Sequence, residues 1–102
     1  MFSNSFMSFV GFEPTNGFQL YTDALLASLL DLAPKNAAGH SLVRKTEQGY
    51  TCRLSIFSPV AQFQSISESE RPQAALEHAQ FQLFRQLARW RKRRRRKKTP
   101  KP

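Results

Sequence analysis

The residues with the clearest chemistry form a basic run near the C-terminus, preceded by Arg85 and Arg89 at a spacing of four residues. The run consists of Arg91, Lys92, Arg93, Arg94, Arg95, Arg96, Lys97 and Lys98. Arginine binds phosphate oxygens through two parallel hydrogen bonds, and lysine binds them as a point charge. Adjacent cations repel one another, and a polyphosphate that binds them releases counterions. The run therefore predicts a site for a polyanion.

The charge of the chain is distributed unevenly. Residues 1–84 hold 5 basic and 7 acidic side chains, whereas residues 85–102 hold 11 basic and no acidic ones. A near-neutral body with a basic tail is typical of proteins that bind nucleic acid or anionic membranes. Arg44, Lys45 and Arg53 add cations on predicted strands and could extend the basic patch. Charge alone suits RNA, DNA, a bilayer or a nuclear import signal.

Catalytic chemistry is weakly represented. His40 and His78 have no further metal ligands at a recognised spacing, and Cys52 alternates with polar residues as a buried, inert thiol would. Glu68 and Glu70 precede a predicted helix, and the favourable interaction of negative charge with a helix N-terminus accounts for them without a catalytic role. The glycines are scattered singly, so no phosphate-binding loop is present. We expect no enzyme, no metal or other cofactor, and no small-molecule substrate.

Composition narrows the class of protein further. A single cysteine excludes an intramolecular disulfide and a cysteine-based zinc cluster. No apolar run is long enough to span a bilayer, and the apolar stretch 1–12 lacks the charged start of a signal peptide. These features predict a cytoplasmic protein without a transmembrane segment.

Hydrophobic periodicity predicts six elements. A short strand over 7–12 precedes a helix over 17–32, for which Thr15 or Asn16 would be the N-cap. That helix carries an apolar face of Phe18, Tyr21, Leu25, Leu29 and Leu32. Three strands are predicted over 41–46, 50–57 and 60–67, and a bulge near Ser65 would let both Phe63 and Ile66 be buried.

The last predicted element is a long helix that begins near Pro72. Its buried seam would be Leu76, Ala79, Leu83, Leu87 and Trp90. Phe81 and Phe84 flank the seam and suggest broad packing, while Trp90 could instead stack on a base. The order is β-α-β-β-β-α, which predicts an α+β fold with a four-stranded sheet and two helices packed on one face. We expect an N-terminal extension over 1–6, a domain over 7–90 and a basic tail over 91–102.

Two short motifs resemble the short ribosome hibernation-promoting factors, also called ribosome-associated inhibitor proteins. Gly11-Phe12-Glu13-Pro14-Thr15, followed by Phe18 and Tyr21, is similar to that family's entry into its first helix. Ala74-Ala75-Leu76-Glu77, followed by Leu83-Phe84-Arg85-Gln86-Leu87-Ala88-Arg89, is similar to its second helix and basic ending. The resemblance covers residues 7–95 and implies the same β-α-β-β-β-α fold.

The resemblance also implies a function and partners. Members of the family bind the small ribosomal subunit in the channel for messenger and transfer RNA, and so idle ribosomes under stress. By this resemblance, Arg85, Arg89 and the run from Arg91 would contact ribosomal RNA. The chain departs from the family at two places. Gln19, Leu25 and Ser28 stand where the family often has basic residues on the first helix, and Arg71-Pro72-Gln73 stands where it often has Asp-x-Tyr before the second helix.

Two other functions remain open from the sequence. A double-stranded-RNA-binding domain shares an α-β-β-β-α core, although such domains carry lysines at the start of the last helix. A membrane-surface or protein-interaction module would use the amphipathic last helix and the basic tail.

Overall fold

The computed structural model describes residues 5–98, and the side chains of residues 5–93. The elements are β1 (Ser5–Val10), α1 (Asn16–Leu30), β2 (Ala38–Thr46), β3 (Gly49–Phe57), β4 (Gln62–Ser69) and α2 (Pro72–Lys98). This order confirms the predicted β-α-β-β-β-α arrangement. Residues 1–4 of the expected N-terminal extension and 99–102 of the tail lie outside the described residues. Ser5 and Phe6 belong to β1 and not to the expected extension, so this strand begins and ends two residues before the predicted one.

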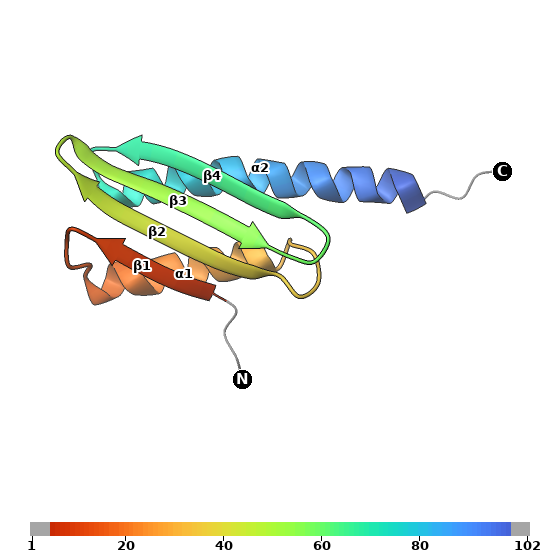
Figure 1. The fold of residues 1–102 in the computed structure, drawn as a ribbon, viewed down its shortest axis with the longest axis horizontal. Coiled ribbons are helices and arrows are strands. Elements are labelled where there is room, and N and C mark those ends of the chain that lie inside the picture. The colour runs from red at the N-terminus through yellow and green to blue at the C-terminus, as the bar shows by residue number, and fades with distance from the viewer. Residues whose placement is uncertain (1–4, 99–102) are drawn as a thin grey trace.

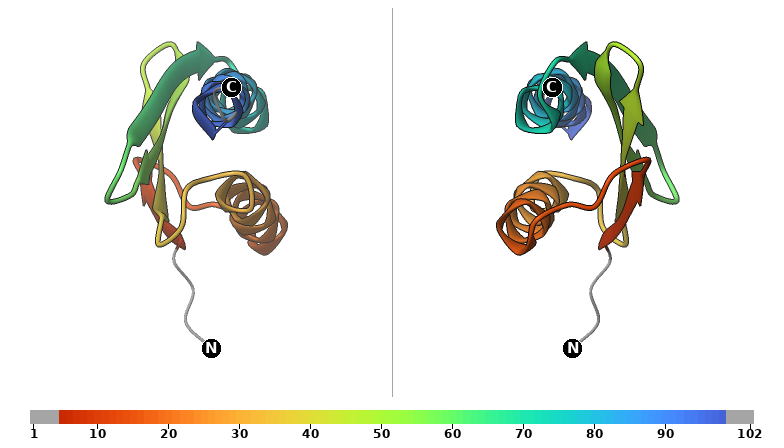
Figure 2. Two further views of the ribbon diagram at one scale, coloured as in Figure 1. Left: turned by 90° about the vertical axis from the view of Figure 1, so that its right-hand side faces the viewer. Right: turned by 90° about the vertical axis from the view of Figure 1, so that its left-hand side faces the viewer.

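The strands form one mixed sheet in the order β1-β2-β3-β4. β1 runs parallel to β2, and the other neighbouring pairs are antiparallel (Figure 1). A parallel pair needs a crossover connection, which α1 supplies. Both helices lie on the same face of the sheet, as predicted, and no helix of the described residues covers the opposite face (Figure 2).

Helix α1 begins as its sequence indicates. Thr15 is the N-cap, and its Oγ1 accepts a hydrogen bond from the backbone amide of Phe18 at 3.1 Å. The helix ends at Leu30, two residues before the expected end, with Asp31 as the C-cap. The buried residues are Thr22, Leu25, Leu26 and Leu29. Tyr21 lies at the edge of this face, and its hydroxyl donates to Glu77 of α2 at 2.9 Å, which ties the two helices together.

The predicted bulge near Ser65 is wrong. The register of β3 with β4 is continuous from Tyr50–Ser69 to Phe57–Gln62. Ser65 and Ser67 face α2, where their hydroxyls donate to the backbone carbonyls of Ala79 and Ala75. Because these bonds satisfy the buried serines, Ile66 takes the outward position, with 54% of its surface exposed.

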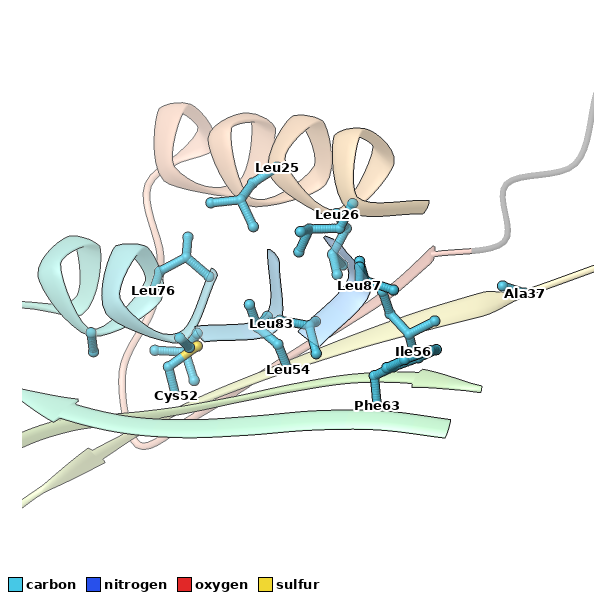
Figure 3. Packing of buried hydrophobic residues seen from close by; sticks show 14 residues of the cluster. Leu25, Leu26, Ala37, Cys52, Leu54, Ile56, Phe63, Leu76, Leu83 and Leu87 are labelled. Atoms are coloured by element: carbon cyan, nitrogen blue, oxygen red, sulfur yellow. The ribbon is translucent and has the colours of Figure 1, made fainter. Parts of the chain in front are cut away.

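The hydrophobic core lies between the helices and the sheet (Figure 3). Its fully buried side chains include Leu26, Leu54, Ile56 and Leu83. Cys52 is also fully buried, and burial raises the pKa of its thiol to about 12. The burial confirms the predicted core position of Cys52, where the thiolate, which is the nucleophilic form, is disfavoured.

Helix α2 buries the predicted seam along one side. Leu76, Ala79, Leu83 and Leu87 are fully buried, and the partly buried Trp90 meets Phe63 edge-to-face with ring centroids 6.1 Å apart. The expected broad packing is wrong, because Phe81 and Phe84 are 60% and 43% exposed. A helix that rests on a sheet through one stripe leaves such flanking positions in solvent.

A substitution at Gly49, the first residue of β3, tests the close approach of β3 and β4. The φ of Gly49 is +149°, and a Cβ atom there would meet the backbone of Ser69, the last residue of β4, and of Glu70, which follows it. We expect Gly49→Ala to lower the free energy of unfolding by at least about 2 kcal/mol, since it adds backbone strain to a backbone clash. Urea unfolding measures this. Gly17→Ala is the control because the nearest atom to its Cβ position is Thr15 Oγ1 at 4.0 Å, an ordinary contact. Equal midpoints for the two variants would contradict the expectation.

Candidate nucleic-acid interface

The C-terminal half of α2 extends the domain into a basic arm, which we define as residues 85–98. A helix of 27 residues is about 40 Å long, whereas a strand of nine residues spans about 30 Å. Helix α2 starts beside the end of β4 and runs past the opposite end of the sheet (Figure 1). The molecule accordingly measures 57 × 32 × 19 Å. Residues 85–90 of the arm still pack on the sheet, and the fold points the part of the arm after Trp90 away from the body.

The first five cations of the arm are accessible to a ligand. They are Arg85, Arg89, Arg91, Lys92 and Arg93, all of which are exposed. The guanidinium of Arg85 lies 5.9 Å from the centroid of the Phe81 ring, a cation–π arrangement. One continuous helix therefore brings Arg85 and Arg89 together with the start of the run.

The remaining predicted contacts of the arm are Arg94, Arg95, Arg96, Lys97 and Lys98. Their backbone is helical, and their side chains lie outside those that the structure describes. Residues four apart on a helix are neighbours, so the run places like charges next to one another along this backbone. Such a helix is stabilised when an anion binds, because the bound negative charge offsets the repulsion between neighbouring cations.

The strand cations lie apart from the basic arm. Arg44 and Lys45 pair with Thr51 and Tyr50 beside the β2–β3 turn, at the end of the sheet where α2 begins. Arg53 lies near the middle of β3, on the open face of the sheet. The structure therefore does not bring Arg44 and Lys45 into one patch with residues 85–98.

Four acidic residues lie at the end of the molecule opposite the arm, where they outnumber the cations Arg44, Lys45 and Arg71. Glu47 lies in the β2–β3 turn, Glu68 and Glu70 lie at the end of β4, and Glu77 lies in the first turns of α2. Helix α1 contains no lysine or arginine. Asp31 lies near Trp90 and Arg91, so the polarity of the molecule comes mainly from the cations of the arm. Such an uneven charge distribution orients a protein as it approaches a polyanion.

Groups suited to catalysis are dispersed in the structure. His40 shares a hydrogen bond of 2.9 Å with the Ser8 hydroxyl on the open face of the sheet, and His78 is exposed on α2. Among the described residues, no three His, Cys, Asp or Glu side chains gather in a metal-binding group. Over the same residues, no helix is both long and apolar enough to cross a membrane. In contrast to these dispersed groups, the exposed cations of the arm lie close together along one helix and are suited to binding anions.

The open face of the sheet holds a further feature that the sequence analysis did not find. His40, Arg53, Ser55, Phe57 and Gln64 line a hollow there. The signal was present in the alternation of the strands, because all five occupy outward positions. Which outward positions meet depends on the pairing of three strands, which the sequence pattern does not specify.

The architecture defines a class: a small α+β domain, with two helices on one face of a mixed four-stranded sheet, the second of which is basic and extends past the sheet. The N-terminal domain of protein Y from Thermus thermophilus has this fold, with a TM-score of 0.72 and 17% identity over 88% of this chain and 99% of that one. A ribosomal subunit interface protein from Coxiella burnetii matches with a TM-score of 0.71 and 13% identity, over 85% and 97% of the two chains.

These structural matches confirm the fold that the sequence resemblance implied. At the level of sequence, no protein-family model and no curated protein matches the chain.

Proposed function

We propose that this protein is a non-enzymatic, cytoplasmic ribosome-binding factor that attaches to ribosomal RNA of the small subunit and blocks the channel for messenger and transfer RNA. The main support is the fold shared, over nearly the whole chain, with a protein Y domain and a ribosomal subunit interface protein. The exposed cations of the basic arm supply a surface suited to RNA. The family resemblance further implies that ribosomes are idled in this way under stress.

The proposed mechanism is occupation of a site. Arginines of the arm bind backbone phosphates, which anchors the protein without reading the RNA sequence. The body, a rigid unit with a continuous core, then fills space that messenger and transfer RNA would occupy. Such inhibition needs no bond to be made or broken, which agrees with the dispersed His and Cys side chains.

Co-sedimentation with purified small subunits tests the proposal. We expect the protein to migrate with the subunits at low salt and to be displaced by messenger RNA that fills the channel. Binding that messenger RNA does not affect would contradict the channel as the site. A protein that stays at the top of the gradient would contradict ribosome binding altogether.

Two competitors separate the other functions that suit a basic arm. Anionic phospholipid vesicles added to the gradient should leave the complex intact, and release of the protein to the vesicles would favour a membrane-surface module. Double-stranded RNA should compete only weakly. Tight duplex binding would favour a double-stranded-RNA-binding domain.

A further inference from the structure

The open face of the sheet contains a hollow of about 470 Å³. Ser55 lies near its centre and is only 4% exposed, although no helix of the described residues covers this face. Larger neighbours shade it: His40 and Gln64 lie beside it on β2 and β4, and Phe57 follows two residues along β3. The result is a recess with an aromatic wall and polar sides.

The side chains around the recess suit an unstacked nucleotide. Phe57 is 49% exposed and offers a ring on which a base can stack. Gln62 and Gln64 carry amides that can donate to and accept from the edge of a base. Arg53 is the charged residue of the lining and suits the phosphate that follows the base. No acidic side chain of the described residues lines the recess.

The recess and the start of the basic arm lie on the two sides of the edge strand β4. The side-chain amide of Gln86 on α2 donates to the backbone carbonyl of Gln64 at 2.8 Å, which joins the helix to that edge. Arg89 and Arg93 follow Gln86 by three and seven residues, so they lie on the same side of α2. A strand of RNA bound to these arginines can therefore pass over β4 and reach Phe57.

We propose that this recess holds one splayed base of single-stranded RNA, whose backbone continues to Arg89 and Arg93. The choice of RNA rests on the proposed ribosomal function, whereas the recess itself rests on the geometry of the sheet. The exposed apolar residues Phe6 and Ile66 on the same face would then flank the bound strand. A duplex would not enter the recess, because its bases are stacked and paired.

Fluorescence anisotropy with a short single-stranded RNA, and with a duplex of the same length, tests this proposal on the full chain. Phe57→Ala should weaken binding of the single strand by about fivefold or more, the loss typical of one base–aromatic stack. It should leave binding of the duplex unchanged. Phe84→Ala is the matched control, since Phe84 is a 43% exposed phenylalanine on the helix side, and both affinities should stay at the wild-type value.

Gln64→Ala provides a second variant that keeps the link to α2, because Gln86 bonds to the backbone oxygen of residue 64. It should shift the preference among single strands of different base composition. Wild-type affinity of Phe57→Ala for the single strand would overturn the proposal, as would an equal loss on strand and duplex. A change in self-association in sedimentation velocity, with RNA affinity intact, would assign the face to a second copy instead.

The same variants keep this proposal separate from the ribosomal one. If wild type and Phe57→Ala both migrate with small subunits and bind the single strand equally, the recess proposal fails and the ribosomal function stands. If the protein does not migrate with subunits, but Phe57→Ala weakens binding of the single strand and not of the duplex, the recess proposal stands and the ribosomal function fails.

Discussion

Replacing Arg89, Lys92 and Arg93 together with glutamine should weaken binding to small subunits by on the order of a hundredfold or more at low salt. The expectation follows from the loss of three charge-assisted contacts, each worth about 1 kcal/mol or more. All three side chains are exposed, and glutamine is a good helix former, so the body and the helix should persist. Sedimentation of the variant with subunits, over a range of protein concentrations, measures the loss.

The salt dependence of binding gives an independent measure of the same three contacts. The log–log slope falls by about 0.7 for each phosphate contact to a single strand, so the variant should be less steep by about 2. Arg44→Gln/Lys45→Gln is the charge-reducing control at the acidic end of the molecule. These two cations are also predicted RNA contacts, and their distance from the arm leads us to expect only a small change. A triple variant with the wild-type slope would show that the arm does not bind phosphate.

The elements that the sequence located correctly are those with local causes. The three- and four-residue spacing of Leu25 and Leu29 marks α1, and the side chain of Thr15 provides its cap within the same segment. The alternation of Cys52, Leu54 and Ile56 marks β3 for a similarly local reason. Such patterns are visible because a helix or a strand places its own residues on one face.

Apart from shifts of one to three residues at the ends of elements, the errors concern partners that are distant in sequence. The bulge near Ser65 was predicted so that both Phe63 and Ile66 could be buried, but the Ser65 hydroxyl takes the inward position by donating to the carbonyl of Ala79 on α2, and Ile66 faces outward. Phe81 and Phe84 suggested broad packing, but α1 does not cover them, so they remain in solvent. Hydrophobicity alone does not say which side of a helix its neighbours occupy.

The candidate site likewise has parts that the sequence predicts and parts that depend on residues distant in sequence. The basic arm could be predicted because its cations are consecutive and continue the seam of α2. The separation of Arg44 and Lys45 from the arm could not, since it depends on the strand register and on the end of the sheet where α2 starts. The recess around Ser55 is formed by side chains of three strands, so the pattern of any one segment does not predict it.

Trp90 connects the two parts of the protein, because it is the last residue of the α2 seam and the residue before the run. Its contact with Phe63 anchors α2 at the end of the sheet where the arm leaves the body. We expect Trp90→Ala to lower the free energy of unfolding by about 2 kcal/mol, less than the loss for a fully buried tryptophan because the ring is only partly covered. Thermal and urea unfolding measure this loss.

The same substitution should affect RNA binding in a way that differs from charge removal. Without its anchor the arm keeps its cations but loses its fixed direction, so the affinity for subunits should fall several-fold while the salt slope stays unchanged. Trp90→Phe is the matched control, since a smaller ring can keep the edge-to-face contact with Phe63. If Trp90→Ala instead unfolds like the wild type and loses affinity only for single-stranded RNA, the indole stacks on a base and does not anchor the arm.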